Sequence, residues 1–389
     1  LEVGVDPTAD KPKKQVSVDV DMKVGTNTIY VAGPIKGSGW INIDYIDVAN
    51  YTDTENRVEP EEKEADDMGI NPPIKTIYTA DPSAHVWKTD PDKLYVYPSH
   101  DRYPQQGCNR MDAFHIYSTK NMVDYTDEGE IFSAYDLEWG REAFDKDGKF
   151  DDGTFMWAPD AAYSEKTGKY YFYYPRPASR AFNDEWMVGV AVSDYPDHGF
   201  VDVGVPIIGI GGRGMIDPCV FTDDDGKSYI YWGNQQMYAA RLNDDMISVN
   251  WDTFKKITPD NYTEGTFVIK RNNKYYFMWS KNDTGSWDYR VFYGTADSPL
   301  PDSIDGANLV LSRLNTDDKS IKATGHHSVI NIPNTDEWYI CYHRFNIPLF
   351  GDFEGQTAAA GNHREVCIDK MEFDNDGNIK VVTATLDGI

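Results

Sequence analysis

A loosely repeated unit, which recurs five times between about residues 74 and 375, most restricts the folds open to this chain. Each unit consists of a polar residue, a short apolar strand, a turn, and a second strand rich in aromatic residues. The intervening turns, such as Lys166-Thr167-Gly168, have the composition of β-hairpin turns. The sequence therefore predicts five successive hairpins. Their leading polar residues are Asp81, Asp160, Asp217, Glu264 and His326.

Further strand candidates lie between these units, at residues 187–192, 237–242 and 290–295. Hairpin units spaced by roughly fifty to eighty residues fit a five-bladed β-propeller with four antiparallel strands in each blade. A β-sandwich would need far fewer residues, and a TIM barrel would need long amphipathic helices that the sequence lacks. We therefore predict an all-β fold, a five-bladed β-propeller with a short N-terminal β-strand appendage.

The N-terminal residues follow a different pattern. Three short strands are predicted between residues 16 and 48, and residues 52–68 are acidic in the manner of an exposed linker. Residues 37–46 resemble the closing strands of a carbohydrate-binding β-sandwich, although three strands make a poor independent domain. The predicted division is an appendage with its linker at residues 1–68 and the propeller at residues 69–389.

Charge and hydropathy exclude several classes of partner. The formal net charge of −27 opposes binding to nucleic acid or to an anionic membrane surface. No run of eighteen or more apolar residues is present, so no membrane-spanning segment is expected. The sequence starts at Leu1 rather than Met, as after removal of a signal or trimming of the chain, and we expect a secreted, periplasmic or cell-surface protein.

Cysteine and aromatic residues mainly indicate packing. The four cysteines are scattered without metal-ligand spacing, which favours small buried side chains over a disulfide or a metal site. The 26 tyrosines and 10 tryptophans favour sheets, and they also offer flat surfaces to sugar rings. We assign Trp87, Trp232 and Trp279 to packing between blades.

The five leading residues carry the chemistry of the predicted fold. The first strand of each propeller blade lines the central channel, so these side chains should converge there. Four carboxyl groups and an imidazole are costly to hold together unless their charge is shared, hydrated or bound to a ligand. Glycoside hydrolysis needs one ionised and one protonated carboxyl group, and a third carboxylate can raise the pKa of the acid by repulsion.

Ordered motifs along the propeller resemble glycoside hydrolase family 43. Three segments look like those that carry the family's signature carboxylates: Ala80-Asp81-Pro82-Ser83, Ile216-Asp217-Pro218-Cys219 and Thr263-Glu264-Gly265-Thr266. Supporting matches lie, in the family's order, at residues 97–101, 117–129, 156–160, 325–329 and 362–364. Each motif is weak alone, and the ordered set is specific.

The resemblance implies a role for each signature carboxylate. Asp81 would be the general base that deprotonates water, and Glu264 would be the general acid. Asp217 would raise the pKa of the acid and orient it. The family inverts the anomeric configuration, so the base and the acid should lie roughly 6.5 to 9.5 Å apart.

The resemblance also implies a substrate-binding group and a metal. Trp157, Asp160 and Arg364 would bind the sugar, and Asp160 would also brace the channel. His326 would face a calcium ion held through water, with His327 as the alternative. Each of these residues also has an alternative role. The alternative is plain packing for Trp157, a surface ion pair for Arg364, and a structural role for His326.

The expected function is that of an inverting hydrolase on plant-type glycans, either an α-L-arabinofuranosidase or a β-xylosidase. Pentose activities dominate the resembled family, whereas the residues themselves do not name the sugar. An endo-arabinanase or an exo-galactanase is less favoured, and a catalytically silent glycan-binding propeller is the alternative from another class. A sugar phosphorylase would need several basic side chains at one point, whereas the predicted channel is acidic. The oligomeric state stays open.

Overall fold

The computed structural model describes residues 71–102, 111–137, 139, 155–177, 185–212, 214–286, 288–312, 321–345 and 363–389. All of them belong to the second of the chain's two units, Lys63–Ile389. The predicted appendage and linker at residues 1–68 lie outside the described residues, as do Cys108 and Asn362.

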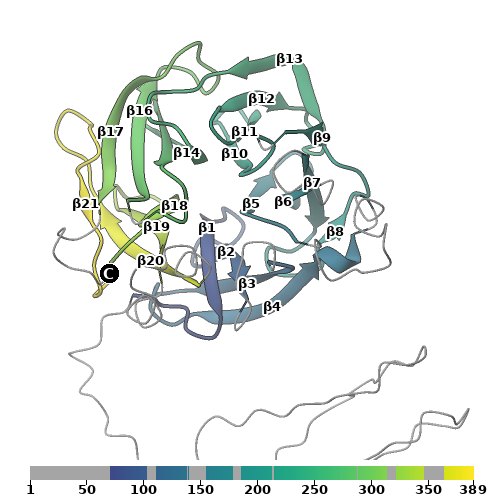
Figure 1. Ribbon diagram of the computed structural model, residues 1–389, viewed down its shortest axis with the longest axis horizontal. Helices are drawn as coiled ribbons and strands as arrows, with labels where there is room; N and C mark the ends of the chain where they lie inside the picture. Colours follow the sequence, from purple (N-terminus) through teal and green to yellow (C-terminus); the bar gives the residue numbers. More distant parts are fainter. Residues whose placement is uncertain are drawn as a thin grey trace, which may run out of the picture. The chain divides into compact units, whose positions relative to one another are not determined.

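Five sheets surround a common centre (Figure 1). Blade 1 contains β1 (Tyr78–Val86), β2 (Leu94–Asp101), β3 (Ala113–Thr119) and β4 (Thr126–Ser133), and a 3₁₀ turn at Ala134–Asp136 follows. Blade 2 contains β5 (Asp160–Ser164), β6 (Lys169–Pro177), β7 (Trp186–Ser193), β8 (Val201–Asp202) and β9 (Ile208–Gly211). Blade 3 contains β10 (Cys219–Thr222), β11 (Ser228–Trp232), β12 (Tyr238–Leu242) and β13 (Val249–Lys256).

Blades 4 and 5 complete the ring. Blade 4 contains β14 (Glu264–Arg271), β15 (Lys274–Lys281), β16 (Arg290–Ala296), β17 (Asp305–Ser312) and β21 (Val382–Thr383). Blade 5 contains β18 (Gly325–Asn331), β19 (Trp338–Phe345) and β20 (Arg364–Met371). Within the described residues, no helix is long and apolar enough to cross a membrane.

The predicted five-bladed propeller is confirmed. Each predicted hairpin forms the first two strands of a blade, and the candidates at 187–192, 237–242 and 290–295 are the third strands β7, β12 and β16. The uniform plan of four antiparallel strands is only partly correct. In blade 2, β9 also pairs with β7, and in blade 4, β21 pairs with β17 in parallel. Blade 5 has three described strands.

Aromatic side chains fill the space within and between the blades, because alternate residues of each strand face a neighbouring sheet. Trp87, Trp232 and Trp279 are all buried, as predicted. The three described cysteines are free and buried, which agrees with the packing role expected of them; they are Cys219, Cys341 and Cys367.

Kinks in the innermost strands turn the site residues. Asp81, Asp217 and His326 have φ angles of 47°, 55° and 40°, a region that side chains other than glycine seldom enter. The pairing register shifts beside Asp81 in β1, beside His326 in β18 and just after Glu264 in β14, as in β-bulges, whereas Asp217 lies two residues before β10. Bulges commonly re-aim side chains next to functional sites. Gly265, which follows Glu264, has a φ of 63° and continues the pattern in blade 4.

Candidate active site

The three signature carboxylates meet in one buried cluster with His326. The Nδ1 atom of His326 lies 3.4 Å from Oδ1 of Asp81 and 3.9 Å from Oδ2 of Asp217. The same Oδ2 accepts a 3.1 Å hydrogen bond from the backbone N–H of Gly265, the neighbour of Glu264. Four blades therefore contribute to a single site, and the exposed fractions of Asp81, Asp217 and Glu264 are 4%, 5% and 7%.

The surroundings of Asp81 favour its ionised form. Nη1 of Arg364 donates a 2.8 Å hydrogen bond to Oδ1 of Asp81, while Nε and Nη2 bind the two oxygens of Asp101 at 2.9 and 2.8 Å. Burial by itself would raise the pKa of Asp81. The positive charge of Arg364 more than offsets burial and holds the pKa well below its usual range, helped by a hydrogen bond from His343 and by the charge that His326 carries at low pH.

Both histidines beside Asp81 are neutral near neutral pH. Burial lowers the pKa of His326 to about 4, although the Asp81 carboxylate opposes this shift. Burial also lowers the pKa of His343. Nδ1 of His343 lies 3.2 Å from the backbone nitrogen of Asp81 and 3.1 Å from its Oδ1. In one tautomer this nitrogen accepts from the backbone N–H, and in the other it donates to the carboxylate.

The surroundings of Asp217 oppose its ionisation. Burial raises its pKa well above the ordinary value, and the nearby charges of Glu264 and Asp81 add to this shift. The Gly265 N–H and Arg364 oppose the shift without cancelling it. Because neighbouring carboxylates repel each other, the charge of Glu264 favours a protonated Asp217.

Two side chains hold the carboxyl group of Glu264. Nδ2 of Asn234 donates to Oε2 at 2.6 Å, and the hydroxyl of Tyr289 donates to Oε1 at 3.0 Å. Asn234 follows the end of β11, and Tyr289 precedes β16, so blades 3 and 4 fix the group jointly. A carboxyl group held at both oxygens has a defined direction, which proton transfer to a leaving group requires.

Asp160 occupies a bracing position. Its Oδ1 accepts hydrogen bonds from the Ser83 hydroxyl at 2.6 Å and lies 3.1 Å from Nε2 of His85. Its Oδ2 accepts from the backbone N–H of Val220 at 2.5 Å. These bonds tie the inner strands of blades 1, 2 and 3 together. Protein donors engage both oxygens of Asp160, which is 2% exposed, and this geometry fits the bracing role expected of it. The expected contact with sugar stays a prediction.

Trp157 is partly buried among other aromatic side chains. Its ring lies 4.1 Å from that of Trp186 and 6.0 Å from that of Phe155, measured between centroids. It packs on a group that includes Ile216, the residue before Asp217. This position agrees with a role in either packing or sugar binding.

The two central histidines differ in their surroundings. His326 faces Asp81 and Asp217, whereas both ring nitrogens of His327 are buried without a hydrogen-bond partner. No group of three or more His, Cys, Asp or Glu that could hold a metal occurs among the described residues. Calcium prefers six to eight oxygen ligands. The residues present therefore do not fit direct calcium coordination, and an ion near His327 would be held through water.

Sequence reasoning missed several residues that orient the site. Asp101 and His343 lie towards the ends of β2 and β19, and Asn234 lies two residues beyond β11. In β15, Ser280 pairs with Glu264, and its hydroxyl accepts a 2.9 Å hydrogen bond from the backbone N–H of His326. In each of these blades, the end of the second strand therefore lies next to the kink in the first strand of the same or of a neighbouring blade. A search for polar residues at the ends of the second strands would have found them.

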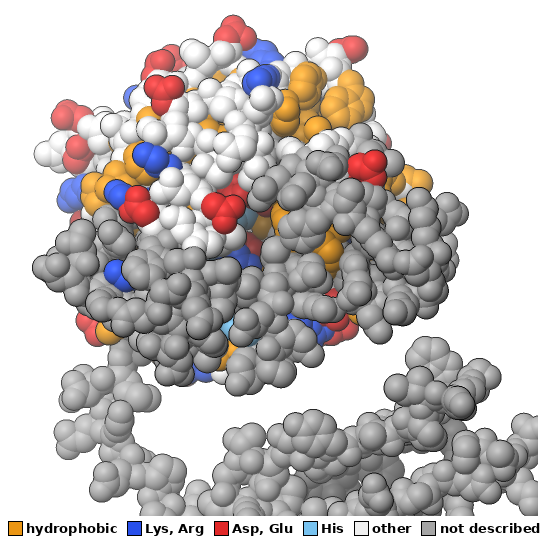
Figure 2. Space-filling model, viewed as in Figure 1, with side chains coloured by type: hydrophobic (Ala, Val, Ile, Leu, Met, Phe, Trp, Pro, Cys, Tyr) orange, Lys and Arg blue, Asp and Glu red, His pale blue; other side chains and the backbone are white. Residues whose placement is uncertain are grey.

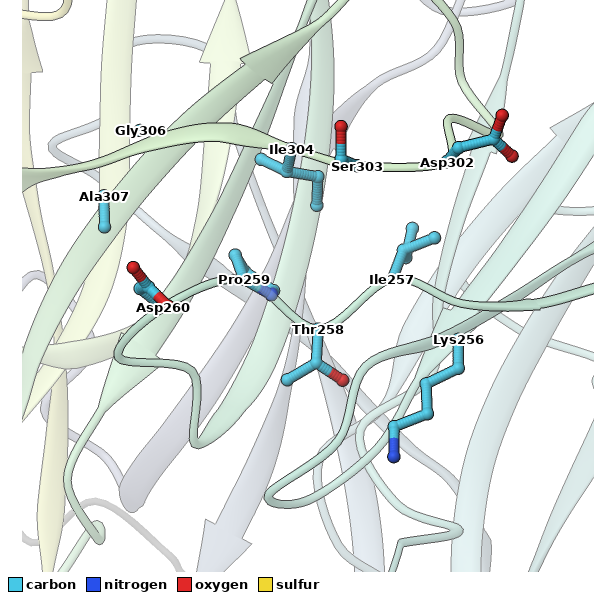
Figure 3. A pocket seen from close by; sticks show the side chains of 10 residues that line it. All are labelled: Lys256, Ile257, Thr258, Pro259, Asp260, Asp302, Ser303, Ile304, Gly306 and Ala307. Atoms are coloured by element: carbon cyan, nitrogen blue, oxygen red, sulfur yellow. The ribbon is translucent and has the colours of Figure 1, made fainter.

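A separate polar pocket lies on the outer side of blades 3 and 4. Its cavity volume is about 320 Å³, and Figure 3 shows its lining, which consists of residues 256–260, 302–304, 306 and 307. None of the carboxylates of the central cluster lines it, so it is distinct from the candidate active site.

Comparison with known proteins gives consistent results. Residues 70–379 match the family described as glycosyl hydrolases family 43. A β-D-galactofuranosidase of Aspergillus niger is 29% identical over 82% of this chain and 86% of its own length. A xylosidase/arabinosidase of Humicola insolens is 29% identical over 79% of this chain and 98% of its own length.

A solved structure is similar over most of the propeller. The crystal structure of a GH43_1 enzyme from Xanthomonas citri covers 80% of this chain and matches it over 93% of its own length. The TM-score is 0.62 and the sequence identity is 27%.

Proposed function

The chain belongs to glycosyl hydrolases family 43 and is a glycoside hydrolase. From this premise we propose that it releases arabinose or xylose residues from plant-type glycans, with inversion of the anomeric configuration. The opposed environments of two carboxyl groups are the main support: a lowered pKa at Asp81 and a raised pKa at Asp217, beside Glu264. Hydrolysis needs this separation of protonation states at one site. The relative from Humicola insolens is named a xylosidase/arabinosidase, which supports the pentose assignment.

In the proposed reaction, Asp81 is the general base. Its ionised carboxylate takes a proton from a water molecule, whose oxygen attacks the anomeric carbon from the face opposite the leaving group. Arg364 keeps the carboxylate ionised and fixes its orientation. Arg364 also approaches the hydroxyl of Thr284 at 3.3 Å, and the two polar groups together could bind a sugar hydroxyl.

Glu264 is the proposed general acid. It transfers its proton to the glycosidic oxygen as the bond to the anomeric carbon breaks. Asn234 and Tyr289 hold its carboxyl group. The raised pKa of Asp217 keeps a proton next to Glu264, and in the proposed reaction the two carboxyl groups share it. Inversion predicts that the reacting oxygens of Asp81 and Glu264 are separated by roughly 6.5 to 9.5 Å, which leaves room for water.

The sugar itself is the open part of the proposal. Endo-arabinanase and exo-galactanase activities remain alternatives, and the name of the Aspergillus niger relative adds galactofuranosides to the substrates worth testing. A silent glycan-binding propeller would be expected to lack or displace a carboxylate, whereas all three occur here in one cluster. Calcium bound through water near His326 or His327 is a further proposal that rests on the family resemblance. A secreted, periplasmic or cell-surface location is also proposed.

Replacement of Glu264 by Gln tests the proposal directly. The amide keeps the shape and an acceptor for Asn234 but has no acidic proton to donate. We expect kcat on natural glycosides to fall by about 10² to 10⁴ while the pentose product still binds. The assay compares the release of arabinose, xylose and galactose from aryl glycosides and from polysaccharides, alongside calorimetric binding of the sugars.

Glu365→Gln is the matched control, since Glu365 is a buried acid of blade 5 that pairs with Arg344, and successive side chains of a strand face opposite sides, so it points away from Arg364. This variant should retain the parental kcat in its folded fraction. Full activity of Glu264→Gln would exclude Glu264 as the acid. Sugar binding without turnover in the parent chain would favour the silent binder.

A further inference from the structure

The outer strand of blade 3 presents two large aromatic side chains to solvent. Trp251 and Phe254 of β13 are 51% and 45% exposed, and we call this pair the aromatic platform. Figure 2 shows a hydrophobic patch at the upper right, in the region that β12 and β13 occupy in Figure 1. An exposed apolar patch on an edge strand promotes unwanted association, so its presence indicates a binding role.

The backbone beneath the platform is a defined bulge. Between the pairs Arg241–Asn250 and Ala239–Lys255, β13 has four residues where β12 has one. Thr253 fixes this bulge, because its hydroxyl accepts from the backbone N–H of Arg241 at 2.8 Å and donates to the carbonyl of Asn250 at 2.6 Å. Bulges of this kind re-aim side chains. The two aromatic rings are therefore held outwards by local structure.

Other aromatic residues support the platform from below. The buried ring of Trp232 lies 6.2 Å from Trp251 and 6.1 Å from Phe254, measured between centroids. Tyr238 stacks against Phe254 at 5.8 Å. Such contacts limit the side-chain motion that a ligand would otherwise have to arrest, so the platform is pre-organised.

The platform lies at the same end of blade 3 as the catalytic cluster. Trp232 is the last residue of β11, and the next residue, Gly233, donates its N–H to the carbonyl of Ile216, directly before Asp217. Asn234 then binds Glu264. Three strand spacings separate the inner strand β10 from β13, which is about 14 Å. A chain of a few sugar residues could span that distance.

We propose that the aromatic platform is a second carbohydrate-binding site, which holds a remote part of a polysaccharide while a terminal residue occupies the catalytic cluster. The ligand class rests on the proposed function. Sugar rings have apolar C–H faces that pack on flat aromatic rings, and the net charge of −27 disfavours an anionic ligand. The polar pocket of Figure 3 begins at Lys256, two residues beyond Phe254, and offers hydroxyl and carboxylate groups to sugar hydroxyls.

Affinity electrophoresis tests the platform. The probes are soluble arabinoxylan, arabinan and galactan, and the host is the full chain carrying Glu264→Gln, so that the polymer is not degraded. Adding Trp251→Ala and Phe254→Ala should weaken the retardation of the protein about tenfold, equivalent to about 1.4 kcal/mol. In the active chain, the same pair of substitutions should lower the ratio of polymer hydrolysis to aryl pentoside hydrolysis by a similar factor.

Tyr195→Ala is the matched control. Tyr195 is 55% exposed and stacks on His198 in the turn between β7 and β8 of blade 2. Its removal should leave retardation unchanged. Retardation that survives the double substitution, or that falls equally in Tyr195→Ala, overturns the proposal, as does a parent chain that none of the polymers retards.

The aryl pentoside assay separates the two proposals and reports folding. If it shows that the double variant is damaged, Trp251→Ala alone replaces it in the same comparison. If the parent chain hydrolyses no glycoside but binds polymer through Trp251, the hydrolase proposal is refuted and the platform proposal stands. Sedimentation measures self-association, and a change of oligomeric state without a change in polymer binding would identify the patch as a subunit contact instead.

Discussion

Arg364 determines the charge state of Asp81. Its guanidinium lies between two buried carboxylates and forms two bonds to Asp101 and one to Asp81. The carboxylate of Asp101 also accepts a hydrogen bond from the backbone N–H of Arg364. The contacts with Asp101 therefore fix the direction in which Nη1 of Arg364 points towards Asp81. Without that positive charge, burial would dominate and the carboxyl group of Asp81 would be harder to ionise.

Replacing Arg364 with Gln should therefore raise the pKa of Asp81. The base must be unprotonated to act, so activity should be lost at a higher pH on the acidic side than in the parent chain. We expect the acidic limb of kcat/KM to move upward by about one pH unit or more. A pH profile on an aryl pentoside measures the shift.

Arg290→Gln is the control for this profile, because Arg290 pairs with Asp288 outside the cluster. It should keep the parental acidic limb. An unshifted limb in an active Arg364→Gln variant would show that another group limits activity at low pH.

At the scale of the strands, the site depends on kinks in otherwise regular hairpins. Gly265 has a φ of 63°, and an added Cβ would lie 3.1 Å from Oγ of Ser280 and 3.3 Å from Nδ1 of His326. Its N–H also donates to Asp217. Gly265 thus links the strand of the expected acid, Glu264, to two other groups. One is Asp217, whose pKa is raised, and the other is His326, which lies beside Asp81.

Gly265→Ala should impair activity more than stability. The left-handed backbone costs about 1 to 2 kcal/mol for a residue with a Cβ, and the crowding displaces Ser280 or His326. Gly168→Ala is the control, since Gly168 has a φ of 69° in a turn with nothing within 4 Å of the added Cβ. Urea unfolding should give similar losses, whereas kcat should fall about tenfold or more only in Gly265→Ala. Equal kcat values would contradict this account.

At the scale of the whole molecule, Asn71 closes the ring of blades. Its Nδ2 donates to the carbonyl of Ile368 at 3.0 Å, and its Oδ1 accepts the N–H of Ile368 at 2.8 Å. It also donates to the carbonyls of Thr385 and Leu386. The start of the described propeller is thereby joined to blade 5 and to its C-terminal segment. This closure brings Arg364 of blade 5 next to Asp81 of blade 1.

Asn71→Ala should destabilise the propeller as a whole. Four side-chain hydrogen bonds are lost, including a 3.4 Å bond from Nδ2 to Oδ2 of Asp369. The N–H of Ile368 remains buried without its partner, so we expect a loss of about 2 to 4 kcal/mol in the free energy of unfolding. Urea denaturation measures it. Asn331→Ala removes two bonds in an exposed turn and should cost about 1 kcal/mol or less. An equal effect of the two substitutions would argue against closure by Asn71.

The sequence by itself determined the hairpins and the residues that open them. Strand alternation and turn composition act over a few residues, so Asp81, Asp160, Asp217, Glu264 and His326 could be placed on inner strands without knowledge of the neighbouring blades. The ordered motifs also indicated the family correctly, because they are short segments that can be compared one by one.

Only the tertiary structure decided what each of these residues contacts. Asp160 and Asp217 open their hairpins alike, yet protein donors engage both oxygens of Asp160, whereas Asp217 faces Glu264 and keeps a raised pKa. Arg364 reaches Asp81 across 283 residues of sequence. Protonation states depend on burial and on distances of a few ångströms between blades, and the closure of the ring sets both.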